Sequence, residues 1–309
     1  MRISSNWARN ASQGIFALDG GVDMAYYIAR AADRKFFDVE GVPGLRQALL
    51  VGHEQGASHL EVSLYKLAPG ATTGWTRCPF EESWFITGGT GEAAFAGLRY
   101  ELGSGDYGVA PVGVAHVLTA GDEGLTWLGV RAPKPPTFDG ARSSIAAKPT
   151  PGENLGRPSE TDPRHRFVGH FEDSDMAPYA QLSMPGYHGP NVKNISLRMM
   201  VDQLLGAQHH TVFVCEIAPK SGPGQAAKVH YHPFEEIYYF TSGGMRGTLD
   251  GNDEVVETGD LVWAGTNGTH GFVNEHDEPA RWIEVQSPIP PTSDGFFFPD
   301  DWRKLPEEH

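Results

Sequence analysis

The feature that most constrains this chain is a segment that occurs twice, 154 residues apart. Residues 78–89 read CPFEESWFITGG and residues 232–243 read HPFEEIYYFTSG, and both contain Pro-Phe-Glu-Glu. Further matches at the same offset are Gly105-Asp106 with Gly259-Asp260 and His116 with His270. A register kept from one motif to the next indicates two copies of one domain. A chain of 309 residues is long enough for two such domains, each with its own core.

Short strands separated by glycine and proline are expected in both copies. Segments such as HTVFVCEIAP, EEIYYFTSG and RWIEVQSP are rich in β-branched and aromatic residues, and stretches of helical period are scarce. The pattern predicts an all-β protein in which each copy forms an antiparallel sandwich or barrel, and tandem barrels are the arrangement that we expect. The expected parts are an N-terminal arm (1–34), a first barrel (35–133), a linker and connecting arm (134–189), a second barrel (190–288) and a C-terminal tail that packs on a barrel (289–309).

The acidic composition argues against several classes of partner. The chain has 39 Asp and Glu against 24 Lys and Arg, and its net charge of −15 repels nucleic-acid phosphates and anionic lipid head groups. No apolar run approaches the ~20 residues of a membrane span, and the N-terminus lacks the apolar core of a signal peptide. Cys78 and Cys215 are far apart and do not indicate a disulfide framework. We therefore expect a cytoplasmic protein whose partner is a small-molecule substrate.

Four side chains of the second copy have the types and the spacing of a metal site. His230 and His232 are two residues apart, so on a strand both imidazoles point to the same face. Glu236 follows a short Pro-Phe-Glu segment, and His270 follows a glycine-rich hairpin. Three imidazoles and one carboxylate suit a divalent ion such as iron, manganese, cobalt, nickel or zinc. Such a set leaves positions open for water, dioxygen or substrate, which is typical of an enzyme site.

These residues resemble the two sequence motifs of the cupin superfamily. The first motif is matched at Gly224, His230, His232, Glu236 and Gly243, and the second at Gly259, His270 and Asn274, with Gly265 and Asn267 where the family has proline and glycine. The whole chain is thus similar to a bicupin. The resemblance implies two jelly-roll barrels of the double-stranded β-helix type and one bound metal per intact site. It also implies pairing of barrels, which makes a homodimer an expected partner.

The first copy keeps only part of the ligand set. Thr76 and Cys78 stand in place of the two histidines, whereas Glu82 and His116 remain. A thiolate is a good soft ligand, but threonine is a poor one, and the remaining set would be unusual. We expect this degenerate first site to be empty. The chain is then expected to bind one divalent transition metal, with iron favoured, in the C-terminal barrel.

Residues two positions apart on a strand point to the same face, which predicts further residues that line the second pocket. The candidates are Tyr238 and Phe240 beside Glu236, Phe272 and Asn274 beside His270, and Lys228 beside His230. The aromatic members either fill the barrel, as small barrels require, or form a wall that binds an aromatic substrate. Glu236 and Tyr238 are the candidate catalytic residues, the first as a base and the second as a group pressing on the substrate.

Three classes of function remain open. The first is a non-haem iron dioxygenase acting on an aromatic or enolic substrate that can carry a carboxylate; this resembles the quercetin- and ring-cleaving bicupins and is favoured by the aromatic pocket. The second is a redox-neutral enzyme of the manganese type: a decarboxylase, isomerase or aminohydrolase, as oxalate decarboxylase and ureidoglycine aminohydrolase are among bicupins. The third is a non-catalytic small-molecule binder, similar to the seed-storage relatives.

Overall fold

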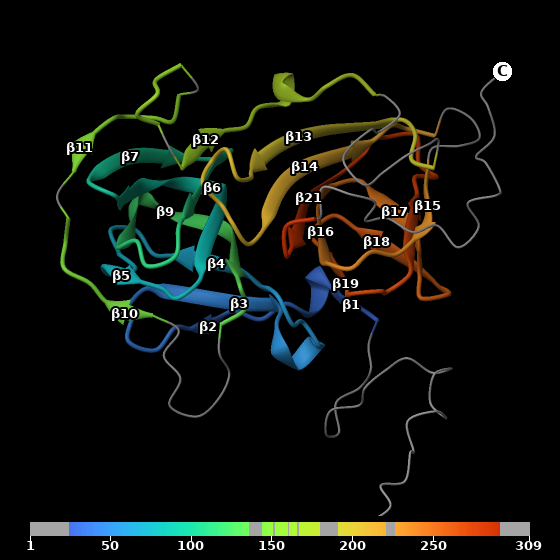
Figure 1. Ribbon diagram of the computed structural model, residues 1–309, viewed down its shortest axis with the longest axis horizontal. Helices are drawn as coiled ribbons and strands as arrows, with labels where there is room; N and C mark the ends of the chain where they lie inside the picture. Colours follow the sequence, from blue (N-terminus) through green and yellow to red (C-terminus); the bar gives the residue numbers. More distant parts are fainter. Residues whose placement is uncertain are drawn as a thin grey trace, which may run out of the picture.

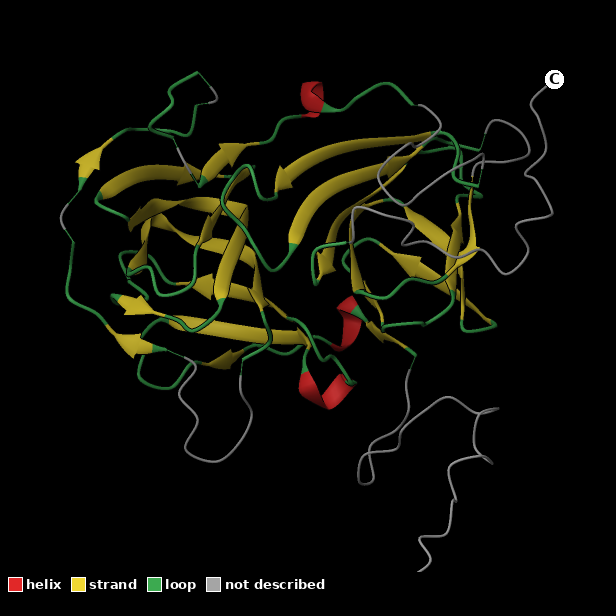
Figure 2. Ribbon diagram, in the orientation of Figure 1, coloured by secondary structure: helices red, strands yellow, loops and turns green. Residues whose placement is uncertain are grey.

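Two β-barrels lie side by side in the computed structural model of the chain (Figure 1). The structure describes residues 25–135, 144–150, 152–159, 161–165, 167–179, 191–220 and 226–290. These residues form strands and three single-turn 3-10 helices, Ala31–Asp33, His53–Gln55 and Asp173–Asp175, without an α-helix (Figure 2). No helix in this part of the chain is long and apolar enough to cross a membrane. The all-β prediction with two tandem barrels is confirmed.

The first barrel is built on one continuous sheet in which every pair of strands except β11–β7 is antiparallel. Its main path is β11 (Glu153–Asn154), β7 (Leu98–Gly103), β6 (Glu81–Phe95), β9 (His116–Ala132), β4 (Glu61–Leu67), β3 (Leu45–Val51) and β2 (Phe37–Asp38). Four strands branch from this path: β5 (Thr76–Arg77), β8 (Asp106–Ala110), β10 (Ile145–Ala146) and β12 (Val168–His170).

The second barrel consists of two antiparallel sheets. The larger has the order β1 (Tyr26–Ala29), β19 (Leu261–Ala264), β16 (Glu235–Ser242), β21 (Ala280–Ser287), β14 (Thr211–Ile217) and β13 (Ile195–Val201). The smaller has the order β15 (Ala226–His230), β20 (His270–Val273), β17 (Gly244–Leu249) and β18 (Asn252–Glu257).

Each barrel is extended by a strand from outside its own repeat. Strand β1 comes before the first barrel but pairs with β19 of the second, with Tyr26 opposite Ala264. Strand β12 comes from the connecting segment and pairs with β8 of the first barrel, with Val168 opposite Gly108. The expected linker therefore contains strands β10, β11 and β12. The C-terminal tail expected to dock on a barrel lies outside the described residues from residue 291 onward.

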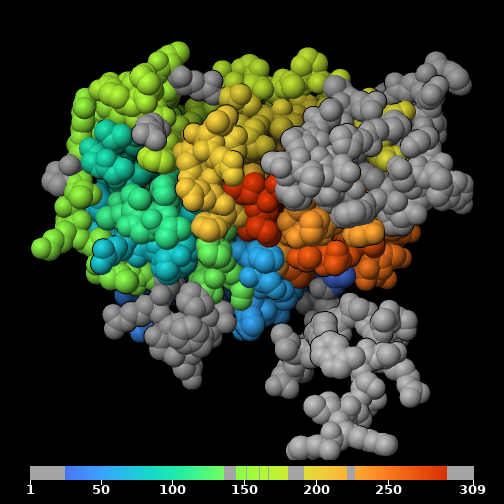
Figure 3. Space-filling model, viewed as in Figure 1, coloured from blue at the N-terminus to red at the C-terminus, as the bar shows by residue number. Residues whose placement is uncertain are grey.

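The molecule has one apolar core between the barrels and one inside each barrel, and successive residues of the central strands belong to different cores. On β16, Ile237 belongs to the apolar cluster between the barrels, whereas Tyr238 and Phe240 belong to the cluster inside the second barrel. On β6, Phe85 and Ile86 divide in the same way between the interbarrel cluster and the interior of the first barrel. Successive strand residues face opposite sides of a sheet, so both motif strands serve two cores. The two barrels meet without a gap on the face shown in Figure 3.

Two buried glutamates fasten the barrels to each other reciprocally. Glu81 accepts hydrogen bonds from the backbone N–H groups of residues 208 and 209 in the second barrel, at 2.6 and 3.1 Å. Glu235 accepts the corresponding bonds from residues 58 and 59 in the first barrel, at 2.5 and 3.1 Å. We call these contacts the interbarrel clasps. Each clasp uses the first glutamate of Pro-Phe-Glu-Glu, so the second glutamate faces the interior of its own barrel.

Candidate metal centre

The four residues with metal-site spacing converge inside the second barrel. The ligand atoms of His230, His232, Glu236 and His270 lie within 4.8 Å of one another. His230 ends β15 directly opposite His270, the first residue of β20, and Glu236 comes from the neighbouring β16. All four side chains are buried.

Hydrogen bonds to backbone carbonyl oxygens orient all three histidines. The acceptor for Nδ1 is Lys228 O at 2.7 Å for His230, Phe234 O at 2.7 Å for His232, and Gly268 O at 2.9 Å for His270. A carbonyl oxygen can only accept, so Nδ1 carries the hydrogen in each ring. The neutral form of each imidazole then presents the lone pair of Nε2, the arrangement typical of metal-binding histidines.

Two of these rings approach the Glu236 carboxylate closely. Nε2 of His232 and Nε2 of His270 lie 2.8 and 3.0 Å from Oε2 of Glu236. Burial, followed by the neighbouring histidines, lowers the pKa of His230 to about 3, which keeps this ring a neutral donor. Burial opposes ionisation of Glu236, but His232 and the other hydrogen-bond donors outweigh it and hold the pKa well below its usual range.

This donor set fits a divalent transition metal. An imidazole nitrogen this close to a carboxylate oxygen needs either a proton or a metal ion between the two atoms, because their lone pairs repel each other. Donor atoms that share one ion at ~2.0–2.3 Å lie within about 4.6 Å of one another, close to the observed spread of 4.8 Å. The assignment of the four residues as ligands stays a prediction, which the backbone contacts of the three histidines support.

Three further polar side chains surround Glu236. The Tyr238 hydroxyl donates to Glu236 Oε2 at 2.5 Å, and Gln286 Nε2 donates to Glu236 Oε1 at 2.6 Å. Gln286 also donates to Glu284 Oε1 at 3.0 Å. Burial and the Glu236 charge raise the pKa of Tyr238 and of Glu284 well above their usual ranges, so both groups are neutral. Glu284 and Gln286 were not predicted as site residues, although alternation places both on one face of β21.

The remaining pocket candidates have other neighbours. The rings of Tyr238 and Phe240 lie 4.7 and 6.2 Å from that of Phe272, and these aromatic side chains form part of the buried core. The Asn274 amide donates to the carbonyl oxygens of two loop residues, Ala218 and Glu278. The structure thus gives Phe240 and Phe272 a packing role and Asn274 a loop-bridging role. Their contact with substrate stays a prediction, as does that of Lys228.

The equivalent place in the first barrel contains an ion-pair network. Glu82 Oε1 accepts from Arg131 Nε at 2.8 Å, and Oε2 accepts from His116 Nε2 at 2.8 Å and from Cys78 Sγ at 3.0 Å. His116 Nδ1 also lies 3.0 Å from Val114 O. Both ring nitrogens therefore face acceptors, and the hydrogen bond and charge of Glu82 outweigh burial and raise the pKa of His116. Burial and the Glu82 charge raise the pKa of Cys78, which keeps the group a thiol.

Arg131 gives a physical reason why this site is unsuited to a metal. It lies opposite Glu82 in the strand register, as Gln286 lies opposite Glu236. Glu82 already pairs with the Arg131 guanidinium, which would repel a metal ion bound there. Cys78, Glu82 and His116 come within metal-binding distance of one another, and Thr76 pairs with His116 across the sheet. The empty first site stays a prediction supported by this charge arrangement.

Comparisons with known proteins agree with this architecture. Residues 220–286 match the sequence family described as Cupin domain. Oxalate decarboxylase from Bacillus subtilis superposes with a TM-score of 0.59 at 17% identity, over 92% of this chain and 80% of that one. Oxalate decarboxylase from Lactobacillus farciminis gives 0.60 at 18% identity, over 92% and 90% of the two chains. The protein Ylba from E. coli, of family DUF861, gives 0.59 at 15% identity, over 89% and 94%.

No curated protein sequence matches the chain. The second barrel contains the stretch that matches the cupin domain family. Over both copies, the chain shares the fold of the oxalate decarboxylase and Ylba structures.

Proposed function

We propose that the second barrel is the active site of a metal-dependent enzyme that catalyses a redox-neutral reaction, such as decarboxylation, on a small carboxylated molecule. The observation that carries the proposal is the convergence of three imidazoles and the Glu236 carboxylate, whose ligand atoms lie within 4.8 Å of one another. These donors are buried and orient inward through backbone hydrogen bonds. Such preorganisation is typical of a site that binds an ion and uses it.

The four donors would hold a single divalent ion. Bound there, the ion supplies Lewis acidity that polarises a substrate oxygen. We favour manganese over iron, because one of the structural neighbours is described by its Mn(II) centres. The oxalate decarboxylases also support a small carboxylated substrate.

The chain's own residues supply a proton and exclude water. Tyr238 holds its proton at Oη, 2.5 Å from Glu236 Oε2, so it can donate to a charge that develops beside this carboxylate. Gln286 fixes the other carboxylate oxygen at 2.6 Å. The packed rings of Phe240 and Phe272 keep water away from one side of the cluster.

The dioxygenase expected from the sequence is the alternative. The same ligand set serves both classes, so the ligands do not separate them, and the named structural neighbours support the redox-neutral class. The deciding measurement is dioxygen consumption by metal-stripped protein reloaded with Mn(II) or Fe(II). We expect carbon dioxide to be released from short carboxylates, or ammonia from nitrogen-bearing ones, with no stoichiometric dioxygen uptake. Uptake of one dioxygen per product molecule, with both oxygen atoms incorporated into the product, would show that the enzyme is a dioxygenase.

Tyr238→Phe tests the proposed proton donor. The variant keeps the ring and removes only the hydroxyl, so we expect kcat to fall about 10²- to 10⁴-fold while the metal content stays the same. The matched control is Tyr239→Phe, because the next residue on the strand faces the interbarrel cluster instead. Metal analysis and steady-state kinetics on both variants provide the readouts. Equal activity of the two variants would remove Tyr238 from the mechanism.

A further inference from the structure

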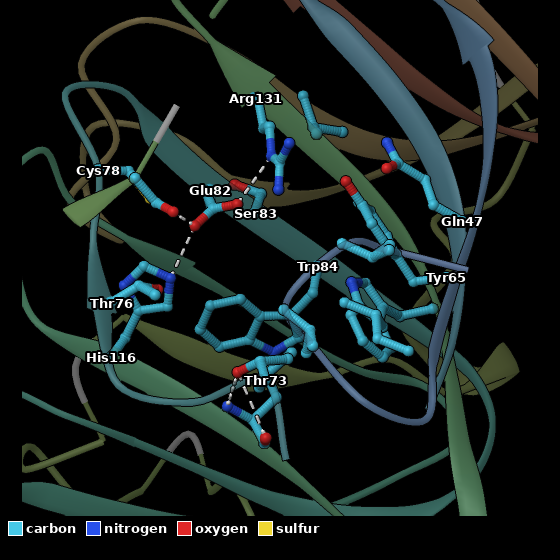
Figure 4. Close-up of a pocket in the computed structure, with 18 of the residues that line it drawn as sticks. Gln47, Tyr65, Thr73, Thr76, Cys78, Glu82, Ser83, Trp84, His116 and Arg131 are labelled. Carbon is cyan, nitrogen blue, oxygen red and sulfur yellow. Dashed lines mark hydrogen bonds and ion pairs between the residues drawn. The ribbon is translucent and has the colours of Figure 1, made fainter. Parts of the chain in front are cut away.

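A cavity of about 270 Å³ lies inside the first barrel (Figure 4). The polar groups of Glu82, Cys78 and His116 gather on one side of it, and Tyr65 lies on the opposite side with Trp84 between them. The volume is just below the range of ~300–1,000 Å³ for pockets that hold drug-sized ligands, so it suits a molecule with a single ring.

At two equivalent positions, this barrel has smaller side chains than the second barrel. Leu118 lies two residues after His116, where the second barrel has the larger Phe272 after His270. Gly129 lies two residues after Trp127, where the second barrel has Glu284 after Trp282. Both first-barrel residues line the cavity, and both of their counterparts are buried. The smaller side chains leave the space open.

The cavity wall is aromatic. Tyr65 stacks on Trp127 with ring centroids 5.0 Å apart and planes inclined by 17°. The Tyr65 ring depends on Gly129, because a Cβ at this position would come within 2.6 Å of Tyr65 Cε2. Trp84 is 4% exposed, and its Nε1–H has no acceptor among the described residues. The Trp84 side chain also lines the cavity, so Tyr65, Trp84 and Trp127 together form an aromatic wall.

Arg131 places a guanidinium at the polar side of the cavity. Nε donates to Glu82 at 2.8 Å and Nη1 donates to Glu61 at 3.2 Å, and neither contact within the described chain uses Nη2. Arg131 and the His116 ring, whose pKa is raised by Glu82, face the carboxylates of Glu82 and Glu61. Glu40 also lines the cavity, but its side chain is exposed and water screens its charge. Nη2 of Arg131 is therefore the donor that one additional anionic group could use.

We infer that this cavity is a second, metal-free binding site, for a small aromatic carboxylate. Its carboxylate would meet the free donors of Arg131, and its ring would lie against Tyr65 and Trp84. Guanidinium groups match carboxylates in geometry and charge, and aromatic walls favour a planar ring. The site uses none of the second-barrel residues, so the inference stands apart from the proposed function.

Calorimetric titration of the full-length protein with benzoate tests the inference. We expect saturable binding of one benzoate per chain, and at least tenfold weaker binding of benzyl alcohol, which has the ring without the charge. Affinity should be the same before and after the metal is stripped, because the second barrel is not involved. A lack of saturable benzoate binding up to about 10 mM would overturn the inference, as would binding that disappears with the metal.

Arg131→Gln tests the polar contact with the side chain that the second barrel has at the equivalent position. We expect benzoate affinity to fall about tenfold or more, the effect of losing a hydrogen bond to a charged group. The matched control is Arg281→Gln, because Arg281 also pairs with two carboxylates, Glu216 and Asp173, and is similarly exposed. Unchanged benzoate affinity in Arg131→Gln would overturn the inference.

Gly129→Ala keeps the test decisive if Arg131→Gln destabilises the barrel. The added methyl group forces the Tyr65 ring out of its place in the wall. We expect this variant to bind benzoate at least tenfold more weakly while its metal content and turnover stay unchanged. Wild-type affinity in folded Gly129→Ala would show that benzoate binds elsewhere.

Discussion

His232→Ala is expected to lose its bound metal and with it all measurable turnover. His232 is fully buried, and its Nε2 is aimed at the Glu236 carboxylate. Removing even an outer partner of a metal ligand weakens metal binding about 10- to 100-fold, so loss of a ligand should exceed this range. The fold should persist, because the second barrel has an apolar core of its own. Elemental analysis, activity and circular dichroism on one preparation give the three readouts.

Cys78→Ala is the matched control for this experiment. Cys78 occupies the equivalent place in the first barrel, where it donates to Glu82. The stoichiometry should stay at one metal per chain in this variant. A loss of metal in Cys78→Ala would place an ion in the first barrel, and unfolding of His232→Ala would make the second-barrel metal structural.

Glu235→Ala is expected to destabilise the whole molecule strongly. The variant removes the acceptor for two backbone N–H groups in the other barrel, those of residues 58 and 59. Each buried donor left without a partner costs about 1–3 kcal/mol, so the free energy of unfolding should fall by roughly 2–6 kcal/mol. Urea denaturation measures the change as a lower transition midpoint.

Two further variants serve as comparisons for the loss of stability in Glu235→Ala: Glu235→Gln is the milder change at the same position, and Glu275→Ala is the control on the surface. Glu235→Gln keeps one acceptor oxygen and should lose less stability. Glu275 forms an ion pair with Arg246 on the surface of the same barrel, at 2.8 Å with both groups exposed, so its removal should change stability little. Equal stability of Glu235→Ala and Glu275→Ala would mean that the clasp does not hold the barrels together.

The sequence predicted the fold well because the repeat and the strand texture are both local signals. The Pro-Phe-Glu-Glu register revealed two copies, and alternation then indicated which residues of β16 share a face. The sequence did not predict that β1 and β12, which lie outside the two repeats, pair with strands of the barrels. Pairing between segments far apart in the sequence leaves no periodic signal. The partners of Glu81 and Glu235 were missed for the same reason, since both partners belong to the opposite barrel.

Within the site, the candidate metal ligands could be predicted from the sequence, whereas the residues that surround Glu236 could not. His230, His232, Glu236 and His270 belong to spaced motifs, and the structure brings them together. Gln286 and Glu284 lie on a strand without a motif, so their role emerges only from the pairing of β16 with β21. The cavity in the first barrel results from differences in side-chain volume between the copies, such as Gly129 against Glu284, which a motif comparison does not weigh.

The interbarrel clasps also limit which parts of a duplicated protein can accumulate substitutions. Each barrel completes the hydrogen bonding of a buried glutamate that belongs to the other, so neither copy can be deleted without harming its twin. The first copy is therefore retained by the interface even after its metal ligands are replaced. Its interior, which faces away from that interface, is free to change. One half of such a duplicate can keep an ancestral chemistry while the other acquires a new pocket.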